Sequence, residues 1–356
     1  MPRLCRTLAA SFALSLAPAA AFAQTPAPAA AGTTPRYQLT VDSARHEVVI
    51  TVGPYDVPSD SGVEDPMATM PMDDILSPIM TWPLRTAIRG YHLTVEDRTG
   101  RPLPRRLLHH YGVVDVDRRE LLYSAVQNLI GGGAESDDVV LPRTVGVPLE
   151  AGHRLAVYFM WKNRSGHDLH GVFLRLRILW IAGNQRPPPR LVMPFWVDVN
   201  YHPGGTDVYD VPPGGCVRAY GFTLPSSGHL LALGGHLHAY GSSLRLEDAE
   251  TGATIARVVA RRDPDGTVRG MSRSIFGAFG EGPRLLAGHR YRVVATYDNP
   301  TPDTLRGMMG VVGGLFLPDD PGTWPALDPG APTYIRGRDL RVWEAGMDAV
   351  GTATRR

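Results

Sequence analysis

Four short motifs in this chain carry histidine or methionine in patterns that can bind a transition metal. Imidazole nitrogen and thioether sulfur are both ligands of such metals. No single motif identifies a metal site. A methionine in an apolar run, for example, is usually part of a hydrophobic core. The four motifs must therefore be considered together and in their order along the chain. They are LLHHYG (His109, His110), VYFMWKN (Met160), GGHLHAYG (His236, His238) and RGMMGVVGGLFLPDD (Met308, Met309).

The two histidines of GGHLHAYG are separated by one residue within an apolar, glycine-flanked run. Residues i and i+2 of a β-strand lie on the same face, so His236 and His238 point one way and Leu237 points into the opposite layer. This is the geometry of a pair of metal ligands. It is equally the geometry of two histidines on a solvated sheet face, and the motif alone leaves both interpretations open.

The adjacent histidines of LLHHYG need a different explanation. Neighbouring residues on a regular strand point to opposite faces of the sheet. His109 and His110 can therefore bind the same metal only at the end of a strand or at a β-bulge.

Short apolar or alternating segments bounded by Gly, Pro, Asp and Asn recur along the chain and predict an all-β protein. Strands at this spacing usually form sandwiches or jelly rolls, so we expect two antiparallel, jelly-roll-like β-sandwich domains packed side by side. The segment GNQRPPPR contains three consecutive prolines, which cannot donate to a sheet, and is the candidate linker. The predicted N-terminal domain spans residues 37–183, the linker 184–192 and the C-terminal domain 193–345.

Two similar segments fit a pair of related domains. AGHRLAVYFMWKN and AGHRYRVVATYDN both run from Ala-Gly-His-Arg through a predicted strand to an asparagine that opens a turn, Asn163 or Asn299. Residues 60–74, DSGVEDPMATMPMDD, and residues 131–138, GGGAESDD, show no periodicity and are interpreted as loops.

The N-terminal sequence has two arginines, an apolar stretch and then an Ala-x-Ala pattern, which is typical of a secretory signal. We interpret residues 1–23 as a signal peptide and 24–36 as a flexible tail, and expect a periplasmic or secreted protein. No later segment reaches the roughly 20 apolar residues of a membrane span. The formal net charge of +1, with scattered charges, argues against nucleic-acid binding. We expect a monomer.

The order and spacing of the motifs resemble those of the copper type II, ascorbate-dependent monooxygenase family, which includes dopamine β-hydroxylase and peptidylglycine α-hydroxylating monooxygenase. LPSSGHLLALGGHLHAYGSSLRL is similar to the stretch that leads the family into its H-x-H motif, and ATYDNPTPD is similar to a turn that follows. MGVVGGLFLP resembles the strand that starts at the family's methionine ligand and ends nine residues later in proline. The resemblance spans roughly residues 105–320.

The resemblance implies one or two copper ions, with one set of ligands in each domain. The second site would consist of His236, His238 and Met309, with Met308 as the reserve. A set of two imidazoles and a thioether suits Cu(I). The first site would consist of His109, His110 and Met160, which stands where the family has a third histidine. His167 and His170, just after this strand, are alternative ligands ranked behind Met160.

The function implied by the resemblance is hydroxylation of a substrate C–H bond with O2 and a small reductant such as ascorbate. Copper held by the catalytic residues His236, His238 and Met309 would bind O2, and copper at the first site would supply an electron. The alternative is a periplasmic copper-binding protein for storage, delivery or electron transfer, without hydroxylase activity. A third interpretation is a metal-free interaction module. The substrate would be a small molecule or a peptide, and the sequence does not identify it.

Overall fold

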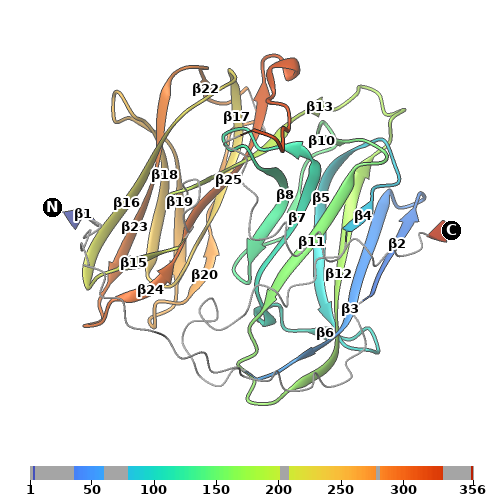
Figure 1. Cartoon of the computed structure of the whole chain (residues 1–356), viewed down its shortest axis with the longest axis horizontal. Helices are drawn as coiled ribbons and strands as arrows, with labels where there is room; N and C mark the ends of the chain where they lie inside the picture. Colours follow the sequence, from blue (N-terminus) through green and yellow to red (C-terminus); the bar gives the residue numbers. More distant parts are fainter. Residues whose placement is uncertain are drawn as a thin grey trace, which may run out of the picture.

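The protein consists of two antiparallel β-sandwiches packed side by side, which confirms the predicted fold class (Figure 1). The computed structural model describes residues 3–4, 36–59, 79–200, 208–277, 281–331 and 354–355. Within these ranges the only helical segments are the short 3-10 turns η2 (Arg105–Leu107) and η3 (Pro321–Thr323). No helix in the described residues is long and apolar enough to cross a membrane.

The first sandwich packs a large sheet against a smaller one. The large sheet has the order β13 (Arg190–Leu191), β10 (Val145–Leu149), β5 (Thr86–Glu96), β12 (Leu169–Ile181), β3 (Glu47–Val57), β2 (Arg36–Asp42) and β26 (Thr354–Arg355), and β6 (Pro102–Leu103) and β9 (Val139–Val140) also pair with β5. The smaller sheet has the order β4 (Ile79–Thr81), β11 (Arg154–Trp161), β7 (Leu108–Arg119) and β8 (Val126–Gly133).

The second sandwich also has two main sheets. One has the order β1 (Arg3–Leu4), β16 (Gly214–Thr223), β23 (Arg290–Asn299), β18 (Gly241–Asp248), β19 (Thr254–Arg262) and β20 (Val268–Met271). The other has the order β14 (Met193–Asp198), β25 (Gly310–Pro318), β17 (Gly228–Leu237) and β21 (Ser274–Ile275), with β22 (Arg284–Leu285) on β17. A separate pair joins β15 (Tyr209–Val211) to β24 (Leu305–Met308).

Each sandwich has its own hydrophobic core, and each core takes one residue from the other half of the chain. The first core draws its buried residues from positions 39–192, with Leu231 added. The second draws them from positions 195–316, with Leu121 added. A hydrogen bond also connects the two halves of the chain: Trp324 Nε1 donates to the Arg119 carbonyl at 2.9 Å. The two sandwiches are therefore docked against each other.

The predicted linker differs from the structure at its end. Arg190 and Leu191 form β13, which pairs with Val145 and Gly146 at the edge of the first sandwich. The three prolines at 187–189 precede this strand, in keeping with their lack of a backbone donor. The chain passes from the first core to the second between residues 192 and 195.

The repeated asparagine has the same role in both sandwiches. Asn163 and Asn299 are both buried, and the side-chain amide of each donates to two backbone carbonyls, one of them four residues later. The side-chain oxygen of each accepts from the backbone and hydroxyl of the residue two positions later, Ser165 or Thr301. The two sandwiches thus share a local architecture, as the repeated segments indicate.

Several sequence-based expectations concern residues that the structure does not describe. The signal peptide and tail fall there almost entirely, and so do the whole of the predicted 60–74 loop and the final part of the predicted C-terminal domain, residues 332–345.

Candidate metal centre

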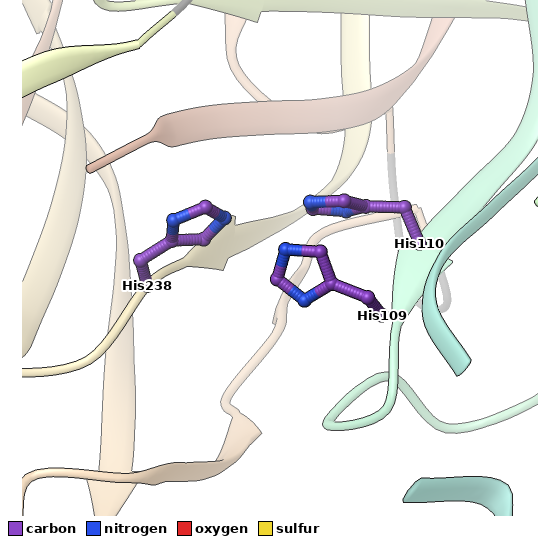
Figure 2. A group of neighbouring side chains, drawn as sticks. All are labelled: His109, His110 and His238. Carbon is purple, nitrogen blue, oxygen red and sulfur yellow. The ribbon is translucent and has the colours of Figure 1, made fainter. Parts of the chain in front are cut away.

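Four histidines from the two sandwiches form one cluster. His109 and His110 lie at the start of β7, His236 lies on β17 and His238 follows the end of that strand. The ring centroid of His110 lies 4.8 Å from that of His236 and 5.5 Å from that of His238. In Figure 2 the rings of His109 and His110 point toward the ring of His238. Nitrogen atoms of these three residues all lie within 4.8 Å of one another, so they can share a metal ion.

A β-bulge brings the two adjacent histidines of β7 to the same side. Met160 on β11 pairs with His110, whereas the next residue, Trp161, pairs with Leu108. His109 is therefore the extra residue of the bulge, and its ring centroid lies 4.2 Å from that of His110. The prediction that this pair sits at a strand end or a bulge is confirmed. Without the extra residue, the strand alternation would place the two rings on opposite faces.

Strand alternation positions the other two histidines. Leu237 is 1% exposed and belongs to the second core, so His236 and His238 face away from that core. Their ring centroids are 5.0 Å apart. The predicted shared face of these residues is confirmed, and it is the face that meets the first sandwich.

Both predicted methionine ligands lie next to a histidine in the strand register. Met160 stands opposite His110. The pairing of Leu237 with Gly310, together with a hydrogen bond from the His238 amide to the Met309 carbonyl (3.4 Å), places Met309 beside His238.

Burial separates Met309 from its reserve. Met160 and Met309 are 7% and 8% exposed, yet neither belongs to a hydrophobic core cluster. Met308 packs against the second core. The arrangement thus favours Met309 over Met308 as the thioether that faces the histidines.

The outer nitrogens of the second pair are held by hydrogen bonds. Nδ1 of His236 lies 2.7 Å from Oε1 of Glu135, a residue of the first sandwich. Nδ1 of His238 lies 2.8 Å from the carbonyl of Gly307, to which it donates. Metal-binding histidines commonly use one nitrogen in this way and present the other to the metal.

The inner nitrogens fit a metal ion. The Nε2 atoms of His110, His236 and His238 are buried and have no hydrogen-bond partner within the described residues. A buried polar atom without a partner costs about 1–3 kcal/mol. Three such atoms in one cluster are explained if a metal completes their bonding. The residues present therefore fit a bound transition-metal ion.

The surroundings of His109, His110 and His238 favour the neutral form of these three imidazoles. Burial, together with nearby Lys162 and His236, lowers the pKa of His109 to about 3. Burial also holds the pKa values of His110 and His238 well below the usual value, and the neighbouring histidines add to the effect. An imidazole must be neutral to bind a metal, so these side chains are ready to bind.

The structure brings the histidine pairs of the two predicted ligand sets together. The four histidines lie in one cluster because the sandwiches are docked with β8 against β14 and β17.

His167 and His170, the alternative ligands, lie on the surface. His167 Nδ1 is 3.2 Å from the Ser165 carbonyl, and His170 Nδ1 is 3.1 Å from Asp56 Oδ1. Neither belongs to the histidine cluster.

Sequence reasoning missed Glu135, because GGGAESDD was interpreted only as a loop. The glycines end β8 and the following turn carries the acid to His236, 101 residues away in the chain. An acid two residues after a glycine run was the available signal, but no local pattern links it to His236.

The chain matches no family model and no curated protein. Among solved structures, it is similar to the cowpea mosaic virus top component, with a TM-score of 0.27, 10% identity, and coverage of 72% of this chain and 96% of that chain. It is also similar to the mavirus major capsid protein, with a TM-score of 0.22, 9% identity, and coverage of 95% and 99%. A putative secreted protein from Eubacterium rectale has a TM-score of 0.22 at 5% identity, with coverage of 71% and 72%. These scores are too low to bear on function.

Proposed function

We propose that this protein is a copper protein whose two sandwiches bind the metal together. The observation that carries the proposal is the convergence of His110, His236 and His238, each with a buried, unpartnered Nε2 atom. His109 lies against this group, with a nitrogen close enough to complete it.

The methionines favour copper over zinc. Met160 and Met309 lie beside the histidines in the strand register and outside both cores. A thioether is a soft ligand that suits Cu(I), whereas imidazole alone also suits zinc. The expected preference is therefore for Cu(I), with Cu(II) bound less tightly.

Copper-dependent monooxygenation is the activity we infer for this centre. The paired histidines and methionine of each sandwich resemble the two ligand sets of the copper type II, ascorbate-dependent monooxygenases. Bound copper would supply one-electron redox chemistry and the activation of O2. Hydroxylation inserts one oxygen atom into a C–H bond and reduces the other to water, which takes two electrons and two protons from a reductant such as ascorbate.

In this activity the histidines would bind the metal, and Gly307 and Glu135 would orient two of their rings. The half-buried histidines would present their unpartnered Nε2 atoms to the metal. The bonds from His238 to Gly307 and from His236 to Glu135 fix the two rings. The second candidate is copper storage, delivery or electron transfer, which is favoured by the partial burial of these side chains between the docked sandwiches.

The decisive experiment measures metal affinity and oxygen uptake on the same preparation. Metal-free protein is titrated with Cu(I), Cu(II) and Zn(II) in competition with chelators, and then supplied with O2 and ascorbate. We expect Cu(I) to bind most tightly and His110→Ala and His238→Ala to abolish the binding. A preference for zinc, or no metal binding, overturns the copper proposal. Tight copper without substrate-dependent oxygen uptake across small-molecule and peptide panels favours the second candidate.

A further inference from the structure

Glu135 reaches from the first sandwich to a histidine of the second. Its Oε1 lies 2.7 Å from Nδ1 of His236, and the two side chains are only 8% and 13% exposed. Such a contact between a buried carboxylate and an imidazole is a charge-assisted hydrogen bond, stronger than a neutral one. It links the loop after β8 directly to the metal centre.

The loop that carries Glu135 is built to hold the carboxylate in place. The hydroxyl of Ser136 donates to Oε1 of Glu135 at 3.1 Å and accepts from the amide of Gly133 at 3.1 Å. A Cβ at Gly133 would overlap the other carboxylate oxygen and lie 2.9 Å from the His109 carbonyl. Glycine is needed here because the carboxylate packs directly against the backbone of the strand pair that carries the first two histidines.

The two histidines of the H-x-H motif therefore have different outer partners. His238 donates to a neutral carbonyl of its own sandwich, that of Gly307. His236 faces a carboxylate of the other sandwich. A carboxylate makes an imidazole more basic than a carbonyl does, and it brings a negative charge close to a bound cation.

We propose that Glu135 is a positioning residue for the metal centre: it holds His236 with Nδ1 protonated and Nε2 presented to the metal, and it does so only while the sandwiches are docked. The proposal rests on the copper centre inferred above. It adds a residue from a loop that carries no metal ligand, and it makes His236 the histidine most dependent on the contact between domains.

The first test needs no metal. Nitrogen-15 NMR of the metal-free protein, above neutral pH, reports which nitrogen of each imidazole carries the proton. We expect His236 to be protonated at Nδ1 in the wild type and in Glu135→Gln, whose side-chain oxygen can still accept. In Glu135→Ala the nitrogen-15 signals of His236 should shift toward the tautomer that is protonated at Nε2. His238 is the internal control, since its partner is a backbone carbonyl.

The second test uses copper. Glu135→Ala should lower copper affinity by about 10–100-fold, as loss of an outer partner does in other metal sites. Glu135→Gln keeps a hydrogen-bond acceptor in the same place but removes its charge. This variant should lose less copper affinity than Glu135→Ala, and it should change the Cu(II) electron paramagnetic resonance spectrum. Glu150→Ala is the matched control, because Glu150 pairs with Arg85 on the surface of the same sandwich.

The two tests separate the two proposals. An unchanged His236 tautomer in Glu135→Ala overturns the role of Glu135, whatever metal binds. The same holds if Glu135→Ala binds copper as tightly as Glu150→Ala does. A wild type that shows the expected tautomer but binds no copper overturns the copper centre and leaves the positioning contact established.

Discussion

Met160 stands directly opposite His110 across the β7–β11 pair, and its side chain is buried without belonging to a hydrophobic core. Residues paired in adjacent strands project to the same face of the sheet. The thioether thus accompanies the histidine pair at the position where an imidazole would give a better Cu(II) site.

Met160→His should shift the preference of the centre toward Cu(II). Imidazole serves both oxidation states, whereas thioether favours Cu(I). We expect Cu(II) affinity to rise by about tenfold or more, equivalent to about 1.4 kcal/mol, and ascorbate-dependent turnover to rise with it. Competition titration and oxygen uptake measure both. A variant that gains neither would show that Met160 is not near the metal.

His110→Leu should remove metal binding with little loss of stability in the metal-free protein. The buried Nε2 of His110 has no partner in the described structure, so replacing the ring with an apolar side chain removes a cost of about 1–3 kcal/mol and offsets the change in packing. Thermal unfolding should show a Tm near that of the wild type without metal. Copper should raise Tm in the wild type only. A large loss of stability without metal would contradict this account.

The stability of the metal-free protein should fall as the pH falls below 6.5. The pKa of His109 drops from 6.5 in the unfolded chain to about 3 in the fold, chiefly because of burial. Between these values the unfolded chain binds the extra proton, so stability is complete above the upper value and is lost toward the lower one.

His109→Gln is the variant that checks this dependence. It should reduce the acid-side slope of the unfolding free energy by up to about 1.4 kcal/mol per pH unit, the effect of one proton. Urea unfolding at several pH values measures the slope.

Glu120 should produce the opposite dependence. Burial raises its pKa from 4.5 to about 8, against the opposing hydrogen bonds from Asn128, and its Oε2 has no partner among the described residues. The folded state therefore holds a proton that the unfolded chain has released. Stability is complete below 4.5 and is lost as the pH rises through about 8.

Glu120→Gln should flatten this loss of stability between pH 4.5 and about 8, because the amide stays neutral. Glu120 precedes Leu121, which belongs to the second core, so the loss should accompany loosening between the sandwiches. Urea unfolding across the pH range measures the difference, and hydrogen exchange locates it. An equal alkaline slope in wild type and variant would mean that Glu120 is ionised in the fold.

Local pattern was enough to predict the fold class and the orientation of individual side chains. Alternation placed Leu237 in the core and its two histidine neighbours on the other face. The bulge at His109 followed from the rule that adjacent residues cannot share a face of a regular strand. These features depend only on a few neighbouring residues, and the two-residue period of a strand can be recognised in such a short segment.

The proximity of the two histidine pairs could not be predicted from the local sequence pattern. The distance between His110 and His236 depends on how two complete sandwiches dock, which involves surfaces assembled from many strands. The contact of Glu135 with His236 depends on the same docking. Residue order carries no information about the angle between domains, so the resemblance did not indicate that the two histidine pairs lie side by side.

In the proposed copper protein, the division of the ligands between two sandwiches would make the molecule a tethered chelator. Each sandwich would contribute a pair of histidines, and the second pair would meet the ion at an effective concentration set by the docked interface and the short chain connection. The overall affinity can therefore be far higher than that of either half, without any additional metal–ligand bond. Any partner or condition that separates the sandwiches would release the metal by dilution of one half from the other, while every ligand and both folds remain intact.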